Sequence, residues 1–142
     1  MGFTTPAFIR KNTPELRKKL ERLGYYLHPE CIDDDRGNYL FVNREYYLNR
    51  PLGYSEELSR SIDCGTNESL FLAIAALRDD TDNNQMFING KGDWGICRDG
   101  SDGGLSGIDF YGMPNDLNVD NYHKATVEEL IEHFKEKEVN HG

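Results

Sequence analysis

Apolar residues recur with a helical period near the start of the chain. Three leucines are spaced at i, i+4 and i+7, and Gly24 follows the last of them. Before them stands Thr13-Pro14-Glu15, which combines an N-cap residue, a proline at the first helical position and an early acid. The pattern predicts an amphipathic helix over residues 14–23 whose apolar face is Leu16, Leu20 and Leu23.

A second amphipathic pattern lies near the end of the chain. Thr126 and Glu129 are three residues apart and form the sequence signature of a capping box. The apolar positions that follow fall on one helical face, and they are Val127, Leu130, Ile131 and Phe134. We therefore predict a C-terminal helix over residues 127–138.

A third helix is predicted over residues 68–78, capped by Thr66 or Asn67. It is apolar on all sides, because residues 70–77 read Leu-Phe-Leu-Ala-Ile-Ala-Ala-Leu. A helix of this kind is buried on most of its surface. We expect it to occupy the centre of the core.

Short apolar or alternating runs between turn-forming residues predict seven strands. They are Ala7–Arg10, Tyr25–His28, Asn38–Asn43, Ser61–Cys64, Gln85–Asn89, Asp93–Arg98 and Tyr122–Lys124. The fifth and sixth are separated by Gly90-Lys91-Gly92, which predicts a β-hairpin.

The order of elements is β-α-β-β, again β-α-β-β, and a closing β-α. A shift of 54 residues superimposes Phe8 on Ile62 and Thr13 on Asn67, which suggests pseudo-repeats at about 7–44 and 60–98. We predict a single α+β domain over residues 1–142, with helices packed on a mainly antiparallel sheet. Residues 99–121 form a long acidic, glycine-rich loop, and loops of this length are commonly functional.

Charge is distributed unevenly. The chain of 142 residues has 16 basic and 25 acidic residues and a formal net charge of −9. Residues 1–24 hold six basic and two acidic residues, a net charge of +4, so the remainder carries −13. We expect no direct binding to nucleic acid or to an anionic membrane, because like charges repel.

An acidic surface is the first candidate for a binding site. Its proposed residues are Asp79, Asp80, Asp82, Asp99, Asp102 and Asp109. Complementary charge speeds association and selects partners, so this surface predicts a protein partner with a basic surface. Tyrosines also suit protein contacts, and six crowd the first half of the chain, namely Tyr25, Tyr26, Tyr39, Tyr46, Tyr47 and Tyr54.

A cysteine-dependent hydrolase or amidase is the alternative. Cys64 stands just before the helix predicted at 68–78, where the helix dipole is expected to lower the pKa of the thiol. His123 is the candidate base, and such a dyad resembles papain-like enzymes, although there the cysteine lies on the helix itself. The other two cysteines are Cys31 and Cys97, and we expect reduced thiols and a cytoplasmic location, since no secretory signal precedes them.

Metal and cofactor signatures are incomplete. Asp79–Asn84 has carboxylates at alternate positions, as calcium loops do, but Gln85 stands where the sharp turn needs glycine. The vicinal-oxygen-chelate fold is also built from tandem β-α-β-β units, yet neither 7–10 nor 61–64 contains the His or Glu ligands of its metal. We expect no cofactor and no metal.

Three segments carry a resemblance. They are FIRKNTPELR at 8–17, ALRDDTD at 76–82 and HKATVEELI at 123–131. They resemble uncharacterised small acidic proteins of phages and mobile elements of gut anaerobic bacteria. The resemblance brings no activity, and it implies an accessory or host-interaction role. The sequence therefore predicts a noncatalytic interaction or ligand-binding protein.

Overall fold

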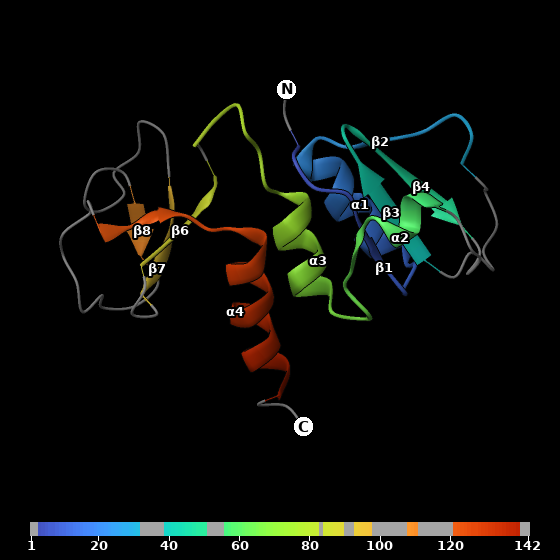
Figure 1. Ribbon diagram of the computed structural model, residues 1–142. Helices are drawn as coiled ribbons and strands as arrows, with labels where there is room; N and C mark the ends of the chain where they lie inside the picture. Colours follow the sequence, from blue (N-terminus) through green and yellow to red (C-terminus); the bar gives the residue numbers. More distant parts are fainter. Residues whose placement is uncertain are drawn as a thin grey trace.

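The computed structural model describes residues 3–31, 39–50, 56–82, 84–89, 93–97, 108–110 and 121–139 (Figure 1). Four helices and nine strands lie within this part of the chain. In order they are β1 (Ala7–Ile9), α1 (Pro14–Leu23), β2 (Tyr26–Leu27), β3 (Tyr39–Asn43), β4 (Tyr46–Arg50), α2 (Glu56–Ser59), β5 (Ile62–Asp63), α3 (Glu68–Ala75), β6 (Met86–Ile88), β7 (Trp94–Cys97), β8 (Ile108–Phe110), β9 (His123–Lys124) and α4 (Val127–Val139).

The first sheet has five strands in the order β2-β4-β3-β1-β5. β3 pairs with β1 and with β4 in antiparallel fashion, and a two-residue turn joins β3 to β4. The two outer pairings, β2 with β4 and β5 with β1, are parallel. The two edges of this sheet are therefore β2 and β5.

The second sheet has four strands in the order β8-β7-β6-β9, and every pairing in it is antiparallel. β6 and β7 form the hairpin that the sequence predicts, with Met86 opposite Ile96. The α+β class is confirmed, but the strands form two sheets, whereas one was expected.

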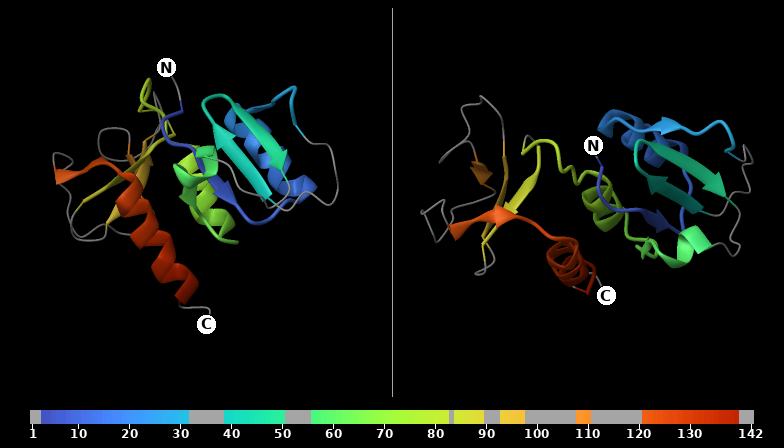
Figure 2. Two further views of the ribbon diagram at one scale, coloured as in Figure 1. Left: turned by 45° about the vertical axis from the view of Figure 1, so that its right-hand side comes forward. Right: turned by 45° about the horizontal axis from the view of Figure 1, so that its top comes forward.

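Helix α3 lies between the two sheets and packs against α1, β1 and α4 (Figures 1 and 2). The side chains of Leu70, Phe71, Ile74 and Ala75 are buried, and one apolar cluster joins α3 to residues of both sheets. The prediction that this apolar helix forms the centre of the core is confirmed. Burial of a side chain such as that of Phe71 stabilises the fold by about 1.5–3 kcal/mol, which explains why a helix of eight residues forms here.

The cap of α1 also follows the sequence. Thr13 accepts a hydrogen bond from the Leu16 N–H at 3.1 Å, and Gly24 ends the helix with a φ of 111°. Glycine is favoured at a left-handed position of this kind because glycine has no Cβ. The predicted bounds of 14–23 are confirmed.

Two strand assignments need correction. β4 was not predicted, and it is the strand with which β2 pairs. β8 lies inside the segment 99–121, which was expected to be a loop.

The first strands of the two pseudo-repeats, β1 and β5, pair side by side, with Ala7 opposite Ile62. The second unit is consequently divided between the two sheets.

The capping box of α4 is formed as predicted. The Glu129 carboxylate accepts a hydrogen bond from the Thr126 N–H at 2.9 Å, and the Thr126 hydroxyl accepts one from the Glu129 N–H at 3.2 Å. Both Glu129 carboxylate oxygens also lie 2.8 Å from His123 Nε2. Partial burial acts to raise the pKa of Glu129, but these hydrogen bonds outweigh it and the pKa lies below its ordinary value.

Glu129→Gln tests this charge. Glutamine still accepts the bond from Thr126, so we expect a loss of only about 0.5 kcal/mol in the free energy of unfolding at pH 7. Since the folded pKa is depressed, the charge stabilises the fold above the ordinary value of 4.5 and ceases to do so as the pH falls through the folded pKa. Urea denaturation at pH 7 and pH 3 measures the difference. An equal loss at both pH values would contradict the assignment.

Candidate functional site

The edge strand β2 exposes apolar side chains to solvent. Tyr26 is 54 % exposed and Leu27 is 46 % exposed. In the part of the chain that the structure describes, they are the only large hydrophobic residues classed as exposed. Side chains alternate across a strand, so each face of β2 exposes one apolar side chain.

The backbone of β2 forms hydrogen bonds with β4 along one of its two sides. The Tyr26 N–H donates to the Glu45 carbonyl at 3.0 Å, and the His28 N–H donates to the Tyr47 carbonyl at 3.1 Å. Because backbone groups alternate in direction along a strand, the N–H and C=O of Leu27 point away from β4. In the part of the chain that the structure describes, no strand pairs with this side, so the outer side of β2 is an open strand edge.

The opposite edge of the same sheet is protected by charge. β5 bonds to β1 through the Ile62 and Cys64 N–H groups, so Asp63 is its outward residue. The Asp63 carboxylate accepts hydrogen bonds from Arg10 Nη2 at 3.0 Å and from the Gly65 N–H at 2.9 Å. A charged residue at an edge discourages pairing with another strand. β2 consists of Tyr26 and Leu27 and therefore contains no charged residue.

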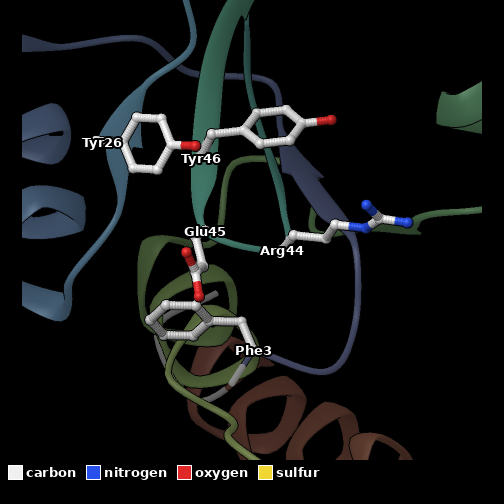
Figure 3. A pocket seen from close by; sticks show the side chains of 5 residues that line it. All are labelled: Phe3, Tyr26, Arg44, Glu45 and Tyr46. Atoms are coloured by element: carbon white, nitrogen blue, oxygen red, sulfur yellow. The ribbon is translucent and has the colours of Figure 1, made fainter. Parts of the chain in front are cut away.

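A hollow of about 470 Å³ lies beside β2 and is lined by Phe3, Tyr26, Arg44, Glu45 and Tyr46. Figure 3 shows the Tyr26 hydroxyl directed toward Tyr46 and the Glu45 carboxylate directed toward Phe3. Arg44 points away from Glu45, in the same direction as the Tyr46 ring. We call this site the aromatic hollow. It combines aromatic faces with one cation and one anion.

Aromatic packing holds the walls of the aromatic hollow in place. The Phe3 ring stacks on Tyr25 with centroids 4.1 Å apart, and the Arg78 guanidinium lies 4.5 Å from the centroid of Phe3. On the other side, the rings of His28 and Tyr46 lie 4.5 Å apart. Contacts of these kinds fix side-chain orientation before a ligand arrives, which reduces the entropic cost of binding.

Arg44 has an unusual backbone conformation. It is the first residue of the two-residue turn between β3 and β4, and its φ is 56°. Hairpin turns favour glycine or asparagine at such positions, since a Cβ there is strained. The turn nevertheless carries an arginine, and its side chain lines the aromatic hollow.

We expect Arg44→Gly to stabilise the fold. Relief of the left-handed strain is worth about 1–2 kcal/mol and the extra freedom of glycine in the unfolded chain costs about 0.5–1 kcal/mol, so a net gain of about 0.5–1 kcal/mol is expected. Urea denaturation measures it. Glu45→Gly is the matched control in the same turn, because the φ of Glu45 is not positive. Destabilisation by both variants would contradict the role of backbone strain.

The proposed acidic residues near α3 are engaged within the chain. Arg78 Nε and Nη2 each donate to a carboxylate oxygen of Asp80 at 2.9 Å, and these hydrogen bonds lower the pKa of Asp80. Lys124 Nζ lies 3.0 Å from an Asp82 oxygen, and Asp79 is also engaged in an interaction. Asp99 and Asp102 lie outside the described residues, as does the side chain of Asp109, whose backbone belongs to β8. The acidic binding surface therefore stays a prediction.

Lys124 holds the segment that follows α3. Its ammonium donates to the Arg78 carbonyl at 3.0 Å and to the Thr81 carbonyl at 2.9 Å, in addition to its pairing with Asp82. Carbonyl and carboxylate oxygens are also the ligands that calcium prefers. Of these acids, Asp82 pairs with Lys124 of β9, whereas Asp80 pairs with Arg78.

The structure does not bring Cys64 and His123 together. Cys64 follows β5 of the first sheet and is buried, with Sγ 3.9 Å from the Ile62 carbonyl oxygen, whereas His123 belongs to β9 of the second sheet and contacts Glu129. Burial, assisted by Asp63, raises the pKa of Cys64 to about 12. The expected direction was wrong, because desolvation of the thiolate outweighs the helix dipole at this site.

The tyrosines that the sequence offers as a group for protein contacts differ in exposure. Tyr39 and Tyr47 are buried, Tyr46 is half-buried, and Tyr54 lies outside the described residues. The signal that identifies Tyr26 is its pairing with Leu27 on an edge strand, and the pairing partner of that strand was not predictable from the local sequence.

No group of three or more His, Cys, Asp or Glu residues able to hold a metal ion occurs among the residues that the structure describes. None of the helices described is long and apolar enough to span a bilayer. No family model, curated protein or solved structure matches the chain.

Proposed function

We propose that this protein is a noncatalytic interaction protein that binds an extended segment of a partner protein along the open edge of β2. The observation that carries the proposal is the exposure of Tyr26 and Leu27 on a strand whose outer backbone groups have no neighbouring strand in the described part of the chain. Addition of a strand to such an edge is a common mode of peptide recognition.

Two kinds of interaction support this mode. Main-chain hydrogen bonds to Leu27 supply affinity that does not depend on the partner's sequence, and burial of Tyr26 and Leu27 adds the hydrophobic contribution. The aromatic hollow beside the strand accommodates a side chain of the partner, which gives specificity. The described residues that line this hollow include no cysteine, serine or histidine.

Leu27→Pro is the sharpest test. Proline removes the one N–H that points away from β4, and proline is tolerated at strand edges, so we expect the fold to survive. A displayed library of random 12-residue peptides, selected on the wild-type protein, supplies the probes. Fluorescence anisotropy of the enriched peptides should show that Leu27→Pro weakens binding more than 20-fold, about 2 kcal/mol.

Two further variants separate backbone from side chain and protect the test from misfolding. Leu27→Ala keeps the N–H and should weaken binding only about 3- to 10-fold, since it removes part of the apolar contact. Leu27→Lys places a charge on the edge, as Asp63 does on β5, and should also abolish binding. Failure to enrich any peptide, or equal binding to wild type and to folded Leu27→Pro and Leu27→Lys variants, would overturn the proposal.

A further inference from the structure

A small cavity lies between the second sheet and the helices α3 and α4. Its volume is about 110 Å³, and its walls come from both helices and from β6 and β7. We call it the apolar cavity. It shares no described residue with the aromatic hollow beside β2, so it is a separate site. The lining includes six apolar side chains, namely Ala73, Met86, Trp94, Ile96, Leu130 and Phe134.

The apolar cavity is larger than an ordinary packing gap. Protein interiors contain few voids larger than one water molecule, and water occupies about 30 Å³ in the liquid. In another protein, an engineered apolar cavity of about 150 Å³ binds benzene. The apolar cavity is smaller but partly open to solvent, so it has room for about one aromatic ring.

Aromatic side chains form one part of the wall. Trp94 of β7 and Phe134 of α4 each meet the His133 ring edge to face, with centroids 4.9 Å apart in both pairs. These contacts fix Trp94 and Phe134 relative to each other. Rings of this kind attract a further ring in an offset or edge-to-face arrangement, and the thioether of Met86 also contacts rings favourably.

Polar groups contribute little to the lining. Gln85 lies at one end, but its Oε1 accepts from the Arg78 N–H and its Nε2 donates to the Ala76 carbonyl. Asn84 is the other polar residue of the described lining, and none of the residues described there is charged. A cavity holds water well only where the water finds two to four polar partners, so this lining favours an apolar molecule. A charged molecule would lose its hydration without gaining an opposite charge.

We infer that the apolar cavity binds a small neutral aromatic molecule with a single ring. The bound ring gains dispersion contacts with side chains of both helices and of the second sheet. Because these contacts exist only in the folded state, the ligand also stabilises the fold. This site adds a small-molecule ligand to a protein whose proposed partner binds elsewhere, at β2.

Methyl NMR tests the inference on the wild-type protein. Ala73, Met86 and Ile96 carry methyl groups in residues that line the cavity. Ala7 and Ile9 are fully buried in β1 of the first sheet and supply the control signals. We expect benzene to shift the first group saturably, with half-saturation below about 5 mM, and to leave the second group unchanged. Benzylammonium has the same ring with a charge and should bind about 10-fold more weakly or worse.

Two leucine substitutions in α3 supply a variant and its matched control. Ala73→Leu places a larger side chain in the cavity wall and should weaken benzene binding by about 10-fold or more, because the leucine takes the space of the ring. Ser69→Leu adds the same side chain one turn earlier, at an exposed position outside the described lining, and should leave binding unchanged. Circular dichroism checks that both variants are folded.

Several outcomes would overturn the inference. The first is the absence of saturable shifts at Met86 and Ile96 of the wild type, and the second is an equal shift at Ala7 and Ile9. Unchanged benzene binding to folded Ala73→Leu would also contradict the site, and equal affinity for benzylammonium would contradict the neutral class of ligand. Strand addition at β2 is tested separately by Leu27→Pro, so the two proposals can fail independently.

Discussion

Replacement of Gln85 by Met should lower the free energy of unfolding by about 3 kcal/mol, because it leaves two backbone groups without partners. Gln85 is 3 % exposed. Its Nε2 donates to the Ala76 carbonyl at 2.9 Å, and its Oε1 accepts from the Arg78 N–H at 2.8 Å. Met has nearly the same shape, so the loss reports the two hydrogen bonds and not a cavity.

The neighbouring residue supplies the control for Gln85. Met86 is also buried, and Met86→Leu conserves apolar volume, so it should cost less than about 1.5 kcal/mol. Urea denaturation followed by circular dichroism measures both variants. A loss below about 1 kcal/mol for Gln85→Met would mean that water satisfies the end of α3, contrary to our account.

Lys124→Met should cost about 2–3 kcal/mol, since the lysine satisfies two carbonyls after α3 with charged hydrogen bonds. The ammonium is partly shielded from solvent, whereas its carboxylate partner Asp82 is 68 % exposed. An exposed ion pair contributes little, so Asp82→Asn should cost less than about 1 kcal/mol. Denaturation of the two variants in parallel separates the contributions, and equal losses would show that the ion pair, not the carbonyl contacts, matters.

Both predictions concern the same structural problem, which is how α3 ends. The last carbonyls of a helix lack partners within the helix. Here Tyr25 donates its hydroxyl to the Ala75 carbonyl at 2.7 Å, while Gln85 and Lys124 serve the residues that follow. These side chains come from both halves of the chain. The end of α3 is therefore fixed by tertiary contacts, and this explains why it stops at Ala75 and not at the predicted residue 78.

The helices with local capping signals were predictable from the sequence. Thr13 and Gly24 bound α1, Asn67 caps α3 by accepting from the Leu70 N–H, and Thr126 begins α4. Each signal acts within a few residues, so no knowledge of the rest of the fold is needed. The hairpin of β6 and β7 was predictable for the same reason, since a short glycine-containing connection joins its strands.

Strands that depend on distant partners were not predictable in the same way. β4 reads Tyr-Tyr-Leu-Asn-Arg, and three consecutive residues of it are buried, so it lacks the alternation that identifies a half-buried strand. β2 and β5 have two residues each and exist only through their parallel neighbours. Parallel pairing joins segments that are far apart in sequence, and local patterns carry no record of it.

In the candidate site, too, the local sequence does not show which of two neighbouring residues is exposed. Tyr25 and Tyr26 are adjacent and chemically identical, yet Tyr25 is 3 % exposed and Tyr26 is 54 % exposed. Tyr25 turns inward to α3, and its neighbour turns outward on the edge of the sheet. Composition indicated that tyrosines suit protein contacts, but only the position of β2 at the edge selects Tyr26 and Leu27.

The exchange rate of the Leu27 amide hydrogen tests strand addition most directly. The protein is labelled with ¹⁵N, and amide exchange is followed by NMR with and without a saturating peptide from the wild-type selection. Our account predicts that the peptide slows exchange at Leu27 at least 10-fold and leaves Asp63, on the β5 edge, unchanged. An unchanged Leu27 amide in the presence of bound peptide would contradict strand addition at β2.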